Sequence, residues 1–184
     1  MTLSIDLLKL FKSGAGADIT FMVKGAGAGV RGHRVVISAR CEILGRLLEH
    51  EKGHEIVLEN TTPDALREFM EYLYTDTCTV TSENAVEIAK LAHMYHMHDM
   101  FNGVVQDVIK LCTPKTCVSM WIAAHKSCIP ELIEPLEKYA MANFFLMRAT
   151  FQNKDMLLEH PEIMMQLITG ARCEITPVGR HRRA

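Results

Sequence analysis

The stretch RGHRVVISARCEILGRLLE, residues 31–49, constrains the fold more than any other part of the chain. Its apolar residues repeat with helical spacing in two neighbouring rows: Val36, Ile43 and Leu47 in one, and Ile37, Cys41, Leu44 and Leu48 in the other. Two rows make a wide apolar face. The pattern therefore predicts one central helix that follows directly on a short strand.

Short runs with the alternation of β-strands lie on both sides of this helix. Residues 18–23 and 30–34 flank the glycine-rich loop 25–29 and predict a hairpin, and residues 54–58 predict a third strand. Residues 78–80 fit a short edge strand or a turn. Further helices are expected from Thr62 and Pro63 onward, from Ser82 to about Tyr95, and over 97–111.

The first residues, 2–13, predict an amphipathic helix with leucines and Phe11 on or near one side. No neighbouring segment would cover this side, and the GAGA run at 14–17 uncouples the helix from the strand after it. Two interpretations stay open: the helix docks on its own domain, or it packs on a second copy of the chain.

Composition excludes several classes of function. The chain of 184 residues has 20 Lys plus Arg and 22 Asp plus Glu, and this net charge of −2 does not favour nucleic-acid binding through the phosphate backbone. Asp6 and Lys9 interrupt any signal peptide, and no run is long and apolar enough to span a membrane. The six cysteines lie mostly in helical patterns, so we expect reduced thiols and a cytoplasmic or nuclear location.

The most enzyme-like cluster is His93, His96 and His98 with Asp99, to which Cys112 and Cys117 could add metal ligands. His93 and His96 could converge on a helix, but His98 would point elsewhere because the helix is expected to break between Tyr95 and Asp99. We found neither a nucleophile elbow nor paired carboxylates in an apolar setting. The sequence predicts no enzyme, no metal site and no cofactor.

Asp18 and Arg34 form a better-founded pair, because a short hairpin brings the carboxylate and the guanidinium together beside the core. A buried or half-buried carboxylate is tolerated as part of a hydrogen-bonded pair, and removing one partner costs roughly 3–5 kcal/mol. We therefore predict an ion pair between these two side chains.

Several of these segments, in this order and spacing, resemble a BTB/POZ domain over residues 3–112. The segments are Asp18-Ile-x-Phe, Gly32-His33-Arg34-Val-Val-Ile-Ser-Ala-Arg, the helix that ends Tyr72-Leu73-Tyr74-Thr75-Asp76, and Glu83-Asn84 to Tyr95-x-Met97. The resemblance implies an α/β fold with a small mixed sheet flanked by helices. We assign residues 1–112 to this domain.

The remainder resembles the start of a BACK domain, a helical segment that we assign to residues 113–172. Thr113-Pro114 is expected to open a helix through Ala124, Pro130 one through Met147, and His160-Pro161 a short last one. Asn143-Phe144, Phe151 and Leu157-Leu158 sit where that family has comparable residues. Residues 173–184, rich in Pro, Gly and Arg, are expected to be a disordered tail.

The resemblance also implies partners and contact residues. The N-terminal helix would form a homodimer through Leu3, Leu7, Leu8 and Phe11. Asp18 and Arg34 would form a charged pocket at the dimer interface, or a salt bridge that serves the fold and has no role in ligand binding.

Many BTB-BACK proteins are adaptors that link the ubiquitin ligase scaffold cullin-3 to a substrate protein. Leu47-Leu48-Glu49 fits the hydrophobic-x-Glu pattern used for cullin docking. The candidate cullin contacts are Leu47, Glu49, Tyr95, Met97 and His98. The alternative is the dimerisation module of a transcriptional regulator, which would bind a co-repressor peptide between its subunits.

Overall fold

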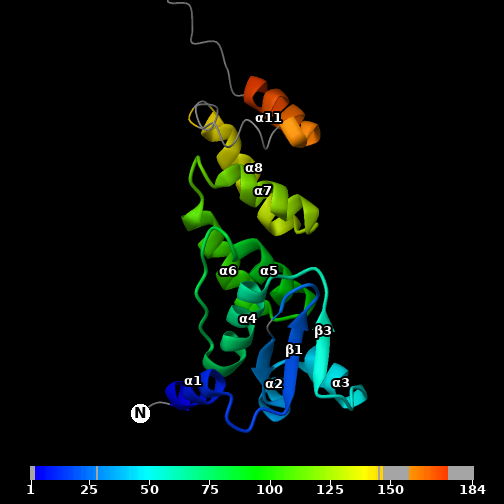
Figure 1. The fold of residues 1–184 in the computed structure, drawn as a ribbon. Coiled ribbons are helices and arrows are strands. Elements are labelled where there is room, and N and C mark those ends of the chain that lie inside the picture. The colour runs from blue at the N-terminus through cyan, green and yellow to red at the C-terminus, as the bar shows by residue number, and fades with distance from the viewer. Residues whose placement is uncertain (1–2, 28, 145, 147–157, 174–184) are drawn as a thin grey trace, which may run out of the picture. The chain divides into compact units, whose positions relative to one another are not determined.

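The computed structural model describes residues 3–27, 29–144, 146 and 158–173. The chain divides into two compact units, residues 1–111 and residues 112–184. Figure 1 shows the order of the helices and strands along the chain. Among the described residues, no helix combines the length and apolarity that a membrane crossing requires.

The first unit contains a mixed sheet of three strands: β1 (Ile19–Val23), β2 (Val30–Gly32) and β3 (Glu55–Leu58). Their order is β2-β1-β3. β1 pairs antiparallel with β2, with Phe21 opposite Val30, and parallel with β3, with Phe21 opposite Ile56. The hairpin and the third strand are where alternation predicted them, and the small mixed sheet is confirmed.

The crossover from β2 to β3 consists of two helices, α2 (Arg34–Arg40) and α3 (Glu42–His50). The prediction of one continuous helix is wrong, because Cys41 between them is extended, with φ −136° and ψ 107°. The break turns the axis so that α2 and α3 pack on each other. The core-facing row is Ile37, Cys41, Leu44 and Leu48, while Leu47 of the other row is exposed.

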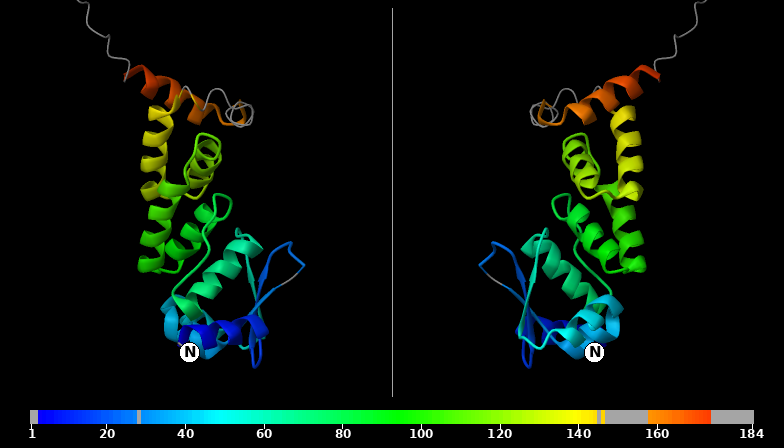
Figure 2. Two further views of the ribbon diagram at one scale, coloured as in Figure 1. Left: turned by 90° about the vertical axis from the view of Figure 1, so that its left-hand side faces the viewer. Right: turned by 90° about the vertical axis from the view of Figure 1, so that its right-hand side faces the viewer.

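Helix α4 (Pro63–Thr75) forms the centre of the unit and contacts α1, α2, α5 and β2. Thr62 caps its start as predicted, because its hydroxyl accepts a hydrogen bond of 3.3 Å from the backbone N–H of Ala65. The buried face of α4 carries Leu66, Phe69, Met70 and Leu73. Two views at right angles to the first show α4 between the sheet and the α5–α6 pair (Figure 2).

Helix α1 (Leu3–Ser13) docks on α4, and α5 (Ala85–Met94) pairs with α6 (His98–Leu111). Helix α5 begins later than predicted, at Ala85 rather than at Ser82. The reason is a closed turn before it, in which the Thr81 N–H donates to Asn84 Oδ1 and the Asn84 N–H donates to Thr81 Oγ1. Residues 78–80 form no strand.

The second unit contains α7 (Cys117–Lys126), α8 (Pro130–Ala142) and α11 (Pro161–Cys173). Helix α7 starts at Cys117 and not at Thr113, because the hydroxyl of Thr116 accepts the N–H of Thr113 in a turn before the helix. Trp121 and Leu132 are fully buried in this unit. The predicted helix end at Met147, together with Phe151, Leu157 and residues 174–184 of the predicted tail, lies outside the described residues. The predicted start of the tail at residue 173 is wrong, because Cys173 is the last residue of α11.

Candidate interaction surfaces

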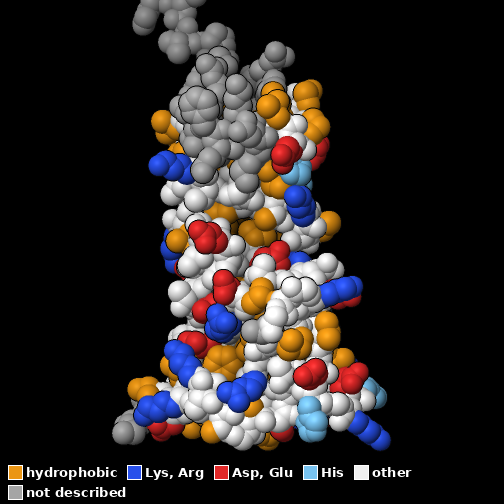
Figure 3. All heavy atoms as spheres, viewed as in Figure 1, with side chains coloured by type: hydrophobic (Ala, Val, Ile, Leu, Met, Phe, Trp, Pro, Cys, Tyr) orange, Lys and Arg blue, Asp and Glu red, His pale blue; other side chains and the backbone are white. Residues whose placement is uncertain are grey.

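Helix α1 exposes apolar side chains in its N-terminal half, among which Leu3 shares a helix face with Leu7. Leu3 is 75% exposed and Ile5 48% exposed, while Leu7 and Leu8 are half-buried. Apolar side chains over α1 are visible in the space-filling view, with several Lys and Arg side chains beside them (Figure 3).

Phe11, at the other end of α1, does not belong to these exposed side chains. Its side chain is buried, and its ring lies 4.9 Å from that of Tyr74 on α4, measured between centroids. The prediction that Phe11 contacts a second copy is therefore corrected: this side chain anchors α1 to its own domain.

The structure brings Asp18 and Arg34 together, but not as an ion pair of side chains. Asp18 Oδ1 accepts the backbone N–H of Arg34 at 2.8 Å, at the first residue of α2. The carboxylate thus satisfies a free N–H at a helix start, where negative charge is favoured.

The guanidinium of Arg34 turns to a different set of acceptors. Its Nη1 donates to the carbonyl oxygens of Leu48 and Glu51, both at 2.9 Å, and its Nη2 donates to that of Gly53. Arg34 therefore holds the last turn of α3 and the loop that leads to β3. The predicted ion pair is corrected to two separate roles, because three carbonyl groups at the end of a helix offer the guanidinium a complete set of acceptors.

His33 is a positioning residue that sequence reasoning missed. Its backbone N–H donates to the hydroxyl of Tyr74 at 2.8 Å, its Nδ1 lies 2.8 Å from the same hydroxyl, and its Nε2 lies 2.9 Å from the carbonyl oxygen of Ala15. Burial raises the pKa of Tyr74, so this phenol stays protonated and available for the network. The network ties the start of α2 to α4 and to the turn after α1.

The candidate cullin contacts lie on two segments. Leu47 (36% exposed) and Glu49 occupy the last turn of α3 and face solvent, and the exposed His98 and half-buried Met97 lie at the corner between α5 and α6. Tyr95 is different, since it is buried with its ring 5.3 Å from that of Phe69. Its predicted contact with a partner is corrected to a core role.

The histidine cluster does not form a metal site in the described part of the chain, where no group of three or more His, Cys, Asp or Glu side chains converges. The ring of His93 packs on Phe101 at 5.4 Å, and His96 and His98 stack on each other at 6.1 Å. This pairing differs from the predicted convergence of His93 with His96. His96 has a left-handed backbone (φ 54°) in the turn between α5 and α6, where its ring lies beside that of His98.

Cys112 and Cys117 are both buried and interact with each other. The hydrogen bond between their side chains lowers the pKa of Cys112 and raises the pKa of Cys117. The thiol of Cys117 also contacts the carbonyl oxygen of Leu136 at 3.5 Å. Cys117 is thus part of the packing between α7 and α8.

Comparison with known families decides what this fold is. The BTB/POZ domain family matches residues 7–111, more than half of the chain. The chain belongs to the BTB/POZ family. Members of this family are protein-interaction modules, so the exposed sides of α1 and α3 in this BTB/POZ domain are its candidate contact surfaces. The match stops at the boundary between the two units, so the BACK assignment of residues 113–172 stays a prediction.

Several curated proteins resemble the BTB/POZ part. BTB/POZ domain-containing protein 9 of Bos taurus is 34% identical over 104 residues, which cover 52% of this chain and 16% of that protein. Kelch-like protein 40b of Danio rerio is 27% identical over 117 residues, which cover 61% of this chain and 19% of that protein. The alignments thus span less than a fifth of these relatives.

A solved structure, the BTB domain of zebrafish PATZ1, superimposes with a TM-score of 0.50 at 22% identity, covering 59% of this chain and 89% of the other. This similarity shows the BTB fold. The α/β architecture predicted from the sequence is confirmed.

Proposed function

We propose that this protein is a homodimeric scaffold that recruits a cullin-3 ubiquitin ligase to a substrate protein. The observation that carries the proposal is the exposure of Leu3 at the start of α1, on the same helix face as the half-buried Leu7, because a helix that is anchored by Phe11 and still exposes an apolar side chain is available to a partner. The resemblance of residues 7–111 to Kelch-like and other BTB/POZ proteins supports the same interpretation.

Self-association is the simplest use of the exposed apolar side chains of α1. In a dimer with a twofold axis, each residue of the interface is buried twice, once in each subunit. Full burial of a leucine side chain contributes about 1.5–3 kcal/mol. The two copies of Leu3 would then contribute several kilocalories per mole to dimer formation.

Cullin binding would use the end of α3 and the α5–α6 corner. Leu47 and Glu49 are both accessible, as the hydrophobic-x-Glu pattern requires, and Met97 and His98 offer a second contact. The thiol of Cys41, just before α3, contacts the carbonyl oxygen of Tyr95 at 3.7 Å and so links the two segments through the core. The substrate would be held by another domain or by a separate protein.

The dimer is tested first, by light scattering on the purified chain. We expect Leu3→Glu combined with Leu7→Glu to give monomers, because each subunit would bring two charges into the contact. Val57→Glu is the matched control, since Val57 is exposed on β3, away from α1. A wild-type chain that is monomeric at micromolar concentration would refute self-association.

Cullin binding is then measured by calorimetry with the N-terminal domain of cullin-3. Submicromolar binding that is weakened by Leu47→Asp and by Glu49→Lys, but not by Glu83→Lys at another exposed position, would support the adaptor role. A folded dimer that does not bind cullin-3 would refute it and would favour the alternative, a dimerisation module that binds a co-repressor peptide.

A further inference from the structure

We infer that a basic pocket between α1, β2 and α4 binds an acidic side chain of an extended protein segment. The pocket has a volume of about 230 Å³ and lies within the first unit. It is distinct from the surfaces assigned to self-association and cullin docking. Its walls carry Phe11 and Lys12 of α1, Val30 and Arg31 of β2, and Arg67 and Glu71 of α4.

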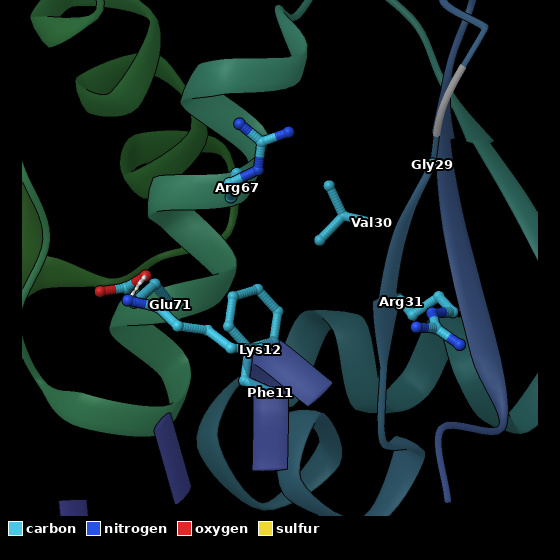
Figure 4. Close-up of a pocket in the computed structure, with 7 residues that line it drawn as sticks. All are labelled: Phe11, Lys12, Gly29, Val30, Arg31, Arg67 and Glu71. Atoms are coloured by element: carbon cyan, nitrogen blue, oxygen red, sulfur yellow. Dashed lines mark ion pairs between the residues drawn. The ribbon is translucent and has the colours of Figure 1, made fainter. Parts of the chain in front are cut away.

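Two apolar side chains form part of the wall of the pocket. Phe11 and Val30 are both buried, and Figure 4 shows the side chain of Val30 pointing from β2 into the space that faces α4, with the ring of Phe11 below it. These two side chains can pack on the methylene groups of a Glu side chain, which a free inorganic anion lacks.

The rim of the pocket is cationic. Lys12, Arg31 and Arg67 line the pocket together with one carboxylate, that of Glu71, so the formal charge of the lining is +2, against −2 for the whole chain. Figure 4 shows the side chain of Arg31 on the side of β2 opposite to Val30. This local reversal of charge favours a partner with carboxylate groups.

Two of these cations, Lys12 and Arg67, are exposed and only weakly paired. The ammonium of Lys12 lies 3.9 Å from the carboxylate of Glu71, at the outer limit of an ion pair, and Lys12 is 62% exposed. Arg67 is 57% exposed and pairs at 3.2 Å with Asp64, one helical turn earlier, in a contact of a kind that contributes little to stability. The guanidinium of Arg31 donates to the carbonyl oxygen of Ser13 at 3.3 Å.

The shape of the site indicates an extended peptide. Strand β2 lies at one end of the strand order, so no described strand pairs with its outer edge. An extended segment can add to such an edge and place alternate side chains into neighbouring pockets. The volume is below the roughly 300–1,000 Å³ of typical small-molecule pockets, so a single side chain fits it better than a whole metabolite does.

The test uses the full chain and two synthetic peptides followed by NMR titration. The first probe is acetyl-Val-Glu-Val-Glu-Val-amide, and the second has Gln in place of both Glu residues. We expect the Glu peptide to bind about tenfold more tightly than the Gln peptide, because charge-assisted hydrogen bonds to Arg are stronger than neutral ones. The amides of Val30, Arg31 and Arg67 should shift on binding.

Two variants and one control locate the site. Arg67→Gln and Lys12→Gln should each weaken binding of the Glu peptide about fivefold or more, whereas Arg46→Gln should not, although Arg46 is also an exposed helical cation, paired with Glu42. Circular dichroism of each variant verifies that the fold is kept.

Three results would overturn the proposal. Equal affinity for the Glu and Gln peptides would show that the pocket does not recognise the carboxylate. An equal loss in Arg46→Gln would show that binding reflects overall charge. Displacement of the peptide by inorganic phosphate at the same concentration would assign the pocket to any small anion. Because the dimer and the cullin contact are measured separately, failure here leaves the proposed function untouched.

Discussion

Replacing Arg34 by Met should loosen the connection between α3 and β3. The substitution keeps an apolar stem of similar length and removes the bonds to the carbonyl groups of Leu48, Glu51 and Gly53. The partly buried bond to Leu48 contributes about 2 kcal/mol, as is typical for a charged donor. The two exposed bonds contribute about 0.5 kcal/mol each, because solvent screens them. The expected loss is thus about 3 kcal/mol, or more than hundredfold in an equilibrium constant.

Hydrogen exchange with mass spectrometry is the suitable assay. A chain of two compact units need not unfold in one step, so a single denaturation curve would mix their stabilities. Peptides covering residues 42–58 report on the affected segment directly. We expect them to exchange up to about hundredfold faster in Arg34→Met at equal protein concentration, with Arg34→Lys in between. The control Arg46→Met, which loses an exposed pair on α3, should exchange like wild type.

Asp18→Asn distinguishes the observed hydrogen bond, from the backbone N–H of Arg34 to Asp18, from the side-chain ion pair predicted from the sequence. The amide oxygen of Asn can still accept the backbone N–H of Arg34, so this variant should remain close to wild type. If Asp18→Asn accelerates exchange as much as Arg34→Met does, the two side chains act as an ion pair and our reasoning is wrong. Unchanged exchange in Arg34→Met would refute the role of the guanidinium.

Two further predictions concern groups in the same unit. Thr62→Val should lower the stability of the first turn of α4 by about 1 kcal/mol, because the backbone N–H of Ala65 loses the hydroxyl that accepts its hydrogen bond. Faster hydrogen exchange in that turn would reveal the loss. Thr61→Val should be neutral or stabilising, since Thr61 Oγ1 is buried and has no hydrogen-bond partner among the described residues; lower stability would contradict this. Burial, followed by the charges of Glu68, Asp107 and Glu71, raises the pKa of Cys78 to about 11. At about pH 8 this thiol is therefore almost entirely neutral, and iodoacetamide should label it far more slowly than the exposed Cys128. The labelling rate of Cys78 should rise as the pH is raised toward 11. Equal labelling rates of Cys78 and Cys128 in a folded chain would refute the raised pKa of Cys78.

The features that sequence predicted well depend on signals a few residues long. Alternation and the glycine-rich loop located the hairpin, and Thr62-Pro63 located the start of α4. The break at Cys41 has no such signal, because the apolar period runs through it and neither Gly nor Pro marks it. At the break Cys41 is buried, and its thiol contacts the carbonyl oxygen of Tyr95, the residue that follows α5 far along the chain; a local pattern carries no information on such a contact.

The candidate surfaces show the same limit. The amphipathic spacing of the first helix predicted Phe11 at the dimer interface, but its ring packs on Tyr74 within the domain. The family motif predicted Tyr95 at the cullin contact, but its ring packs on Phe69. Spacing indicates that a side chain is apolar and where it points on its helix, but not which element covers it. The hydrogen-bond acceptors of the Arg34 guanidinium could not be predicted from the sequence either, because they are backbone carbonyl groups, which every residue carries.

The order of the strands also affects how the chain emerges from the ribosome. β1 is the middle strand of the sheet, and its antiparallel neighbour β2 follows it after a short loop. Its parallel neighbour β3 begins only at Glu55, after both crossover helices. Until then, one edge of a central, apolar strand has no partner, and unpaired edges of this kind are where nascent chains aggregate. This edge is closed when the chain has been made through Leu58 and β3 pairs with β1.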